Sequence, residues 1–71
     1  MSRLGQSTTS FEERRTEANR LLEMIRSVGA SIINATYSEV QIAFLKKCAD
    51  QDQIITPSMI FYLRDLKDKI L

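Results

Sequence analysis

Residues 55–71 read ITPSMIFYLRDLKDKIL and carry the pattern of one well-formed helix. Thr56 stands where a helix N-cap is expected, and Pro57 follows at the first helical position, where its fixed φ suits a helix. Apolar residues then recur at steps of four, three and four, at Met59, Leu63, Leu66 and Ile70. This spacing places four side chains on one stripe, so the segment predicts an amphipathic helix that packs against the rest of the chain.

A longer helix is predicted to begin at Ser10. The residues SFEE (10–13) have the form of a capping box, in which the side chains of Ser10 and Glu13 each bond the other's amide. Apolar residues follow at steps of three and four, at Ala18, Leu21, Ile25, Val28 and Ile32. The opposite face carries glutamate–arginine pairs, Glu12/Arg15, Glu17/Arg20 and Glu23/Arg26. These pairs predict a solvated surface rather than a nucleic-acid contact.

Gly29 interrupts this pattern, and two interpretations are open. A glycine often stands just past a helix end, which would end the helix near Val28. Alternatively, the helix continues through Gly29 at a cost of about 1 kcal/mol relative to alanine. Because the apolar stripe persists to Ile32 and Ile33, we expect continuation to about Asn34.

A second helix is predicted to begin at Thr36. The residues TYSE (36–39) form another potential capping box, and Ala35 and Val40 are placed for a hydrophobic staple. The following apolar residues occupy most of the helix circumference: Tyr37, Val40, Ile42, Ala43, Phe44, Leu45, Cys48 and Ala49. Such a distribution indicates a central, largely buried helix, followed by a polar turn over residues 49–55.

Three capped helices with short connections and no strand pattern predict an all-α fold. We expect a small three-helix arrangement over residues 10–71, with a long first helix, a central apolar helix and an amphipathic C-terminal helix. Residues 1–9 are mostly small and polar and are predicted to be a flexible tail.

Composition limits the classes of protein to consider. Apolar residues make up 44% of the chain, too many for a disordered protein. Charged residues make up 27% and nearly cancel to a net charge of +1, which argues against strong attraction to nucleic acid or anionic membrane. No apolar run approaches the roughly 18 residues of a membrane span, and the N-terminus has no apolar signal core. We therefore expect a cytoplasmic or nuclear protein.

The sequence offers little for chemistry. It contains no histidine and one cysteine, Cys48, so it lacks the commonest general base and the ligands of a typical zinc site. Its two glycines, Gly5 and Gly29, are isolated and form no phosphate-binding loop. We therefore expect no enzymatic activity, cofactor, metal or small-molecule substrate, and a buried, unreactive Cys48.

Residues 55–71 resemble the recognition-helix segment of winged-helix regulators. The shared features are the Thr56 start and the spacing of Met59, Leu63 and Leu66. The resemblance implies a nucleic-acid-binding regulator of the helix-turn-helix type. The segment lacks the family's glycine at the helix end, and it offers Phe61, Asp65 and Asp68 where base-reading side chains would stand.

The chain is also similar to the small helical MOZART subunits of γ-tubulin complexes. The shared points are LLEMI (21–25), IIN (32–34), a helix ending near Cys48, and ITP (55–57). This resemblance implies a partner in microtubule nucleation. The spacings between these points differ from the family's by several residues, and we assign the chain to neither family.

The interpretation that we adopt is a protein–protein interaction module: a small subunit, adaptor or regulator that self-associates or binds another helical protein. A chain of 71 residues has little core and commonly gains stability from a partner. Its apolar content exceeds what three short helices can hide, and exposed apolar surface usually marks a binding site. The predicted interface, on the C-terminal helix, is Phe61, Tyr62, Ile70 and Leu71. A helix-turn-helix-like nucleic-acid-binding regulator is the alternative.

Overall fold

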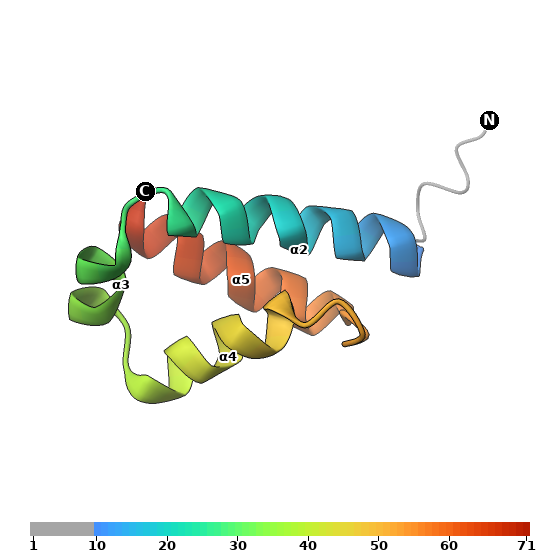
Figure 1. Cartoon of the computed structure of the whole chain (residues 1–71). Coiled ribbons are helices and arrows are strands. Elements are labelled where there is room, and N and C mark those ends of the chain that lie inside the picture. Colours follow the sequence, from blue (N-terminus) through green and yellow to red (C-terminus); the bar gives the residue numbers. More distant parts are fainter. Residues whose placement is uncertain (1–9) are drawn as a thin grey trace.

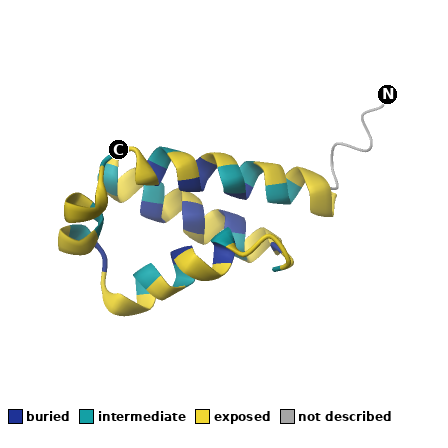
Figure 2. Ribbon diagram, viewed as in Figure 1, coloured by how far each residue is buried: buried dark blue, intermediate teal, exposed yellow. Residues whose placement is uncertain are grey.

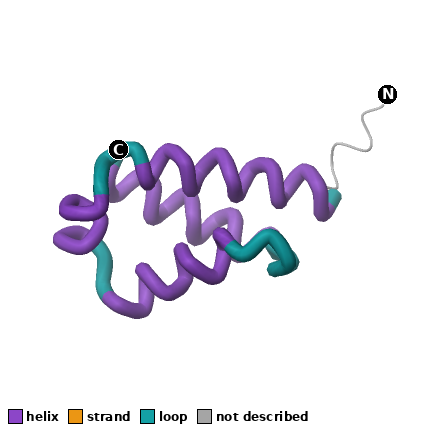
Figure 3. The backbone as a smooth tube through the Cα atoms, viewed as in Figure 1, coloured by secondary structure: helices purple, strands orange, loops and turns teal. Residues whose placement is uncertain are grey.

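The computed structural model describes residues 10–71, and within that range the chain forms four helices and no strand (Figure 1, Figure 3). The helices are α2 (Phe11–Arg26), α3 (Ala30–Thr36), α4 (Glu39–Ala49) and α5 (Pro57–Ile70). The all-α prediction is therefore confirmed, although residues 10–71 contain one short helix, α3, more than the three expected. The predicted flexible tail, residues 1–9, lies outside the described residues.

α2 is the central element, because it packs against each of the other three helices. α5 lies alongside α2 and runs in the same direction, α4 runs the opposite way, and α3 closes the end where α2 and α5 finish (Figure 1). The core consists of Ala18, Leu21, Leu22, Ile25, Tyr37, Leu45, Cys48, Ile55, Ile60, Leu63 and Leu66. Figure 2 shows these buried residues gathered mainly where α2 faces α5.

The prediction that the second helix is central and largely buried is wrong. α4 buries only Leu45 and Cys48, whereas Val40 is 76% exposed. Ala43 is exposed as well. Apolar residues do occupy most of the circumference of α4. One side of the helix, however, meets no other helix among residues 10–71, so the apolar residues on that side stay in solvent.

Two of the predicted helix starts are confirmed. The backbone N–H of Glu13 donates to the Ser10 hydroxyl at 3.1 Å, and the Ser10 N–H donates to the Glu13 carboxylate at 3.0 Å. At α5 the N–H of Met59 donates to the Thr56 hydroxyl at 3.3 Å, and Pro57 occupies the first helical position. Each cap satisfies an amide that the first turn of the helix leaves unbonded.

The predicted continuation of the first helix through Gly29 is wrong. α2 ends at Arg26, and Gly29 has a φ of 97° and a ψ of 153°, a conformation that is open almost only to glycine. The chain therefore turns sharply before α3 begins at Ala30. The alternative interpretation, a helix that ends just before Gly29, is the correct one. Ile32 and Ile33 continued the apolar pattern because they belong to a new helix.

The predicted start of the second helix at Thr36 is also wrong. Thr36 is the last residue of α3, and the N-cap of α4 is Ser38. The N–H of Gln41 donates to the Ser38 hydroxyl at 3.3 Å, and the Ser38 N–H donates to the Gln41 side chain at 3.0 Å. The box is thus SEVQ rather than TYSE. Between the helices Tyr37 is buried, and its hydroxyl donates a hydrogen bond to the carbonyl of Leu66 in α5.

The predicted stripe of α5 packs as expected. Leu63 and Leu66 are buried, and Met59 and Ile70 are partly buried against the core. Within residues 10–71, none of the helices has the length and apolar character needed to span a membrane.

Candidate protein-binding surfaces

The four residues of the predicted interface do not gather into one patch. Phe61 and Leu71 are 64% and 61% exposed, whereas Ile70 is half-buried and packs against the core. Phe61 and Leu71 stand ten residues apart, a separation of about 15 Å along a helix. Consecutive residues on a helix diverge by about 100°, so Phe61 and Tyr62 leave α5 in different directions.

The Tyr62 side chain lies towards α4. Its ring packs edge-on against Phe44, with the ring centroids 4.6 Å apart and an interplanar angle of 62°. This aromatic contact joins α5 to α4 and uses part of the Tyr62 surface within the chain. The side chain remains 36% exposed.

The Phe61 side chain lies on the α2 side. It borders a hollow of about 370 Å³ whose other lining residues are Glu13, Arg14, Glu17, Pro57, Ile60 and Arg64. The Glu17 carboxylate pairs with Arg20 at 2.7 Å and lies 3.6 Å from Arg64. The hydrogen bond from Arg20 lowers the pKa of Glu17, although partial burial opposes it. Whether Phe61 contacts a partner here stays a prediction.

Of the three predicted glutamate–arginine pairs on α2, the structure forms one, Glu17/Arg20. The prediction for Arg15 is wrong, because its guanidinium turns towards α4 and donates to three backbone carbonyls. The distances are 2.7 Å to Cys48, 2.7 Å to Asp50 and 2.6 Å to Gln53. A fixed cation at the C-terminal end of α4 also complements the helix dipole.

Arg14 makes a similar contact one residue earlier. Its Nε donates to the Ile55 carbonyl at 2.6 Å. Arg14 and Arg15 therefore fasten the connector between α4 and α5 to the first turns of α2. Sequence reasoning missed this role, because a backbone acceptor 33 to 41 residues away leaves no mark on helical spacing.

Cys48 is fully buried, as predicted. Burial raises the pKa of its thiol, while the nearby charges of Arg15 and Lys47 oppose that rise to a lesser degree. The protonated thiol is therefore the favoured form, and its lack of reactivity stays a prediction. Among residues 10–71, no cluster of three or more histidine, cysteine or acidic side chains is arranged to hold a metal ion.

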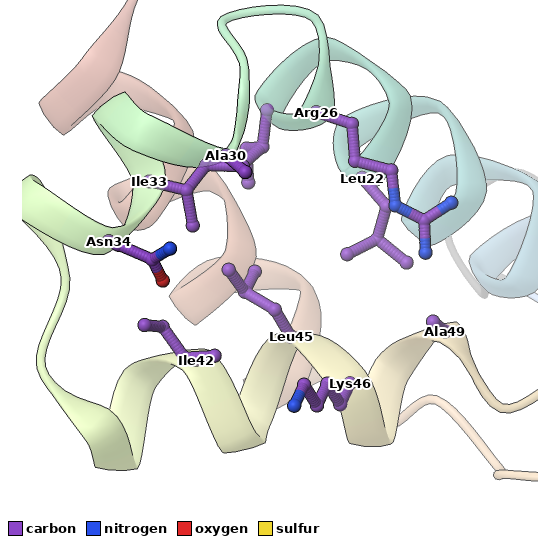
Figure 4. A pocket seen from close by; sticks show the side chains of 10 residues that line it. Leu22, Arg26, Ala30, Ile33, Asn34, Ile42, Leu45, Lys46 and Ala49 are labelled. Atoms are coloured by element: carbon purple, nitrogen blue, oxygen red, sulfur yellow. The ribbon is translucent and has the colours of Figure 1, made fainter.

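A second surface lies between three helices, where sequence reasoning placed nothing. A groove of about 380 Å³ opens between α2, α3 and α4 (Figure 4), and we name it the α2–α3–α4 groove. Its lining residues are Leu22, Ile25, Arg26, Ala30, Ile33, Asn34, Ile42, Leu45, Lys46 and Ala49. The groove exists because the chain turns at Gly29 and carries α3 away from the axis of α2. Gly29, followed by two isoleucines, was the one sequence feature that pointed to it.

No protein-family model matches the chain, and no match was found among the curated proteins or the solved structures compared with it. Its function is therefore inferred from the geometry of these two surfaces.

Proposed function

We propose that this chain is a non-enzymatic helical module that binds another protein, either a second copy of itself or a different helical chain. The observation that carries the proposal is the amount of apolar surface left in solvent. Large apolar side chains are exposed on every helix, in one connector and just after α5: Phe11, Ile32, Val40, Ile54, Phe61, Tyr62 and Leu71. Isolated exposed apolar residues are ordinary, but seven of them in 62 described residues, together with an apolar groove that other residues line, favour a binding role.

The size of the core supports the same proposal. Eleven residues make up the buried core of residues 10–71. A core this small gives marginal stability, and binding to the folded state alone would add to it by mass action. A cytoplasmic or nuclear subunit, adaptor or regulator suits this description.

The helix-turn-helix alternative has less support. Phe61, Asp65 and Asp68 all lie exposed on α5. Duplex binding requires cations and amides at the positions that face the bases, so acidic and aromatic side chains at these three positions oppose it. Protein binding is therefore the function that we retain.

The test combines mass measurement with capture. Light scattering of the purified chain over a range of concentrations measures self-association, and immobilised wild-type chain captures partners from a cell extract. We expect a complex in one of the two measurements. Phe61→Asp should reduce it if the α5 surface is used, whereas Ser58→Asp adds the same charge at another exposed α5 position and should leave it intact.

Circular dichroism of each variant checks that the helices remain. A wild-type chain that stays monomeric at every concentration and retains no partner would overturn the proposed function.

A further inference from the structure

The shape of the α2–α3–α4 groove follows from how α4 is held. At its C-terminal end α4 is fastened to α2 through the bond from Arg15 to the Cys48 carbonyl. At its N-terminal end α4 follows α3 and stands away from α2 (Figure 1). Between these ends, Leu22, Ile33 and Leu45 point into the same space from three different helices (Figure 4).

The walls of the groove are apolar and partly open to solvent. Leu22, Ile25 and Leu45 are buried at its base. Higher on the walls Ile33, Ile42 and Ala49 are half-buried, and Ala30 is exposed. A groove bordered by helices suits the apolar face of one more helix, whose side chains at positions i, i+3, i+4 and i+7 enter it together. Such a helix would complete a four-helix packing around the groove.

The rim of the groove is basic. Arg26 of α2 and Lys46 of α4 both line it and both are exposed. Neither forms an ion pair within residues 10–71, and none of the ten lining residues is acidic. The complementary partner surface therefore carries carboxylates beside its apolar stripe.

α3 is the least buried wall of the groove. It has seven residues, none of them buried, and its N-cap Gly29 supplies no side-chain bond. Helices this short are marginal in water and depend on contacts with other elements. A helix seated in the groove would supply such contacts to Ala30 and Ile33.

Resting on the proposed function, we infer that the α2–α3–α4 groove binds an amphipathic helix of a different protein, whose apolar stripe is flanked by aspartate or glutamate. The apolar walls provide the area for binding, and Arg26 and Lys46 select for acidic flanks and set the register of the helix.

A designed peptide tests the inference directly. The probe is a fluorescein-labelled helical peptide of about four turns, with leucine at i, i+3, i+4 and i+7 and glutamate on both flanks. One control peptide has lysine in place of each glutamate, and another has the same composition in scrambled order. Fluorescence anisotropy with the full chain should show binding of the glutamate peptide and at least tenfold weaker binding of both controls.

Two adjacent lysines give a matched pair of protein variants. Lys46→Glu reverses a charge on the rim, whereas Lys47→Glu makes the same exchange at an exposed residue of the same helical turn that does not line the groove. We expect Lys46→Glu, combined with Arg26→Glu, to weaken peptide binding about tenfold, because two exposed attractions become repulsions. Lys47→Glu should leave the affinity for the peptide within about twofold of the wild-type value. Ala30→Trp, at an exposed wall position, should weaken binding by filling the groove.

The outcomes separate this inference from the proposed function. The inference about the groove would be overturned if the glutamate peptide did not bind, or if Lys46→Glu and Lys47→Glu weakened its binding equally. A captured complex that Phe61→Asp abolishes and Lys46→Glu leaves intact would also overturn the groove while supporting the proposed function. A complex lost with Lys46→Glu that proves to be a second copy of the chain would overturn the assignment to a different protein.

Discussion

The two halves of the molecule use their apolar residues differently. α2 and α5 bring Leu21, Ile25, Leu63 and Leu66 together with at most 2% of each side chain exposed. α3 buries none of its residues and α4 buries two, so the α3–α4 half keeps apolar walls open to solvent (Figure 2). The difference indicates that α2 and α5 supply most of the stability, while the α3–α4 half leaves more of its apolar surface exposed.

Truncation of one apolar residue in each half gives the largest expected contrast. Leu63→Ala should lower the free energy of unfolding by about 3 kcal/mol, because the side chain is fully enclosed and its loss leaves a cavity. Ile42→Ala should cost about 1 kcal/mol, because that side chain is half-buried beside the groove. Denaturant unfolding followed by circular dichroism measures both. Equal costs would mean that the two halves are packed alike.

The link between the halves gives the next largest effect. Arg15→Ala removes three bonds from the guanidinium to backbone carbonyls and should cost about 2 kcal/mol. Arg15→Lys should recover only part of this, since an ammonium lacks the planar fork. Arg20→Ala is the matched control on the same helix, where only an exposed pair is lost, and it should change the unfolding midpoint little. An Arg15→Ala variant as stable as Arg20→Ala would contradict the assigned role.

Alkaline pH should lower the free energy of unfolding, because two buried groups outside α2 and α5, Cys48 and Tyr37, lose protons there. Burial raises the pKa of the Cys48 thiol above its ordinary 9.0 and that of the Tyr37 phenol above its ordinary 10.0. The unfolded chain therefore releases these protons at lower pH than the folded chain. Stability should be constant from pH 7 to about 9 and then fall as pH rises further.

Tyr37→Phe separates the two groups. It should cost about 1 kcal/mol at neutral pH, because the hydrogen bond to the Leu66 carbonyl is lost, and it should make the alkaline decline shallower. Unfolding midpoints measured at intervals between pH 7 and 11 test this. A decline as steep as that of the wild-type chain would place the titration elsewhere.

The sequence predicted the features of the fold that depend on local chemistry. The caps at Ser10 and Thr56 and the stripe through Leu63 follow from spacing within one helix, and all three are present. The errors fell where two local solutions compete. Gly29 can lie within a helix or can follow the end of one. Which of the two occurs depends on whether residues 30–36 are more stable as a separate helix than as a continuation of α2.

The binding surfaces were predicted less well, because they depend on how helices meet. Phe61 and Leu71 were recognised as lying off the stripe, and both are exposed. The groove depends on the angles at which α2, α3 and α4 meet, and the bonds from Arg15 reach acceptors 33 to 38 residues away, so the spacing within any one helix specifies neither. Single-helix patterns thus predict which residues are buried better than they predict what the remaining surface forms.

The smallest predicted effects concern the junction of α3 and α4, where two overlapping capping boxes compete. TYSE at 36–39 and SEVQ at 38–41 both fit the pattern, and the structure selects the second. Serine is a somewhat better N-cap than threonine, and starting α4 at Ser38 frees Tyr37 to reach Leu66. Ser38→Ala should therefore cost about 1 kcal/mol, the usual worth of an N-cap, and Thr36→Ala should cost less than about half of that.

Ser10→Ala provides the control in the stable half, because it removes the same kind of box from α2. Its cost should match that of Ser38→Ala in global unfolding, since both expose one amide of the first helical turn. Hydrogen exchange should then distinguish the halves. Ser38→Ala should speed exchange in α3 and α4 and leave the α2 and α5 amides protected, because few buried side chains couple α3 and α4 to the rest of the core. A larger effect of Thr36→Ala than of Ser38→Ala would mean that α4 begins at Thr36. An equal rise of exchange in α5 would mean that the two halves open as one unit.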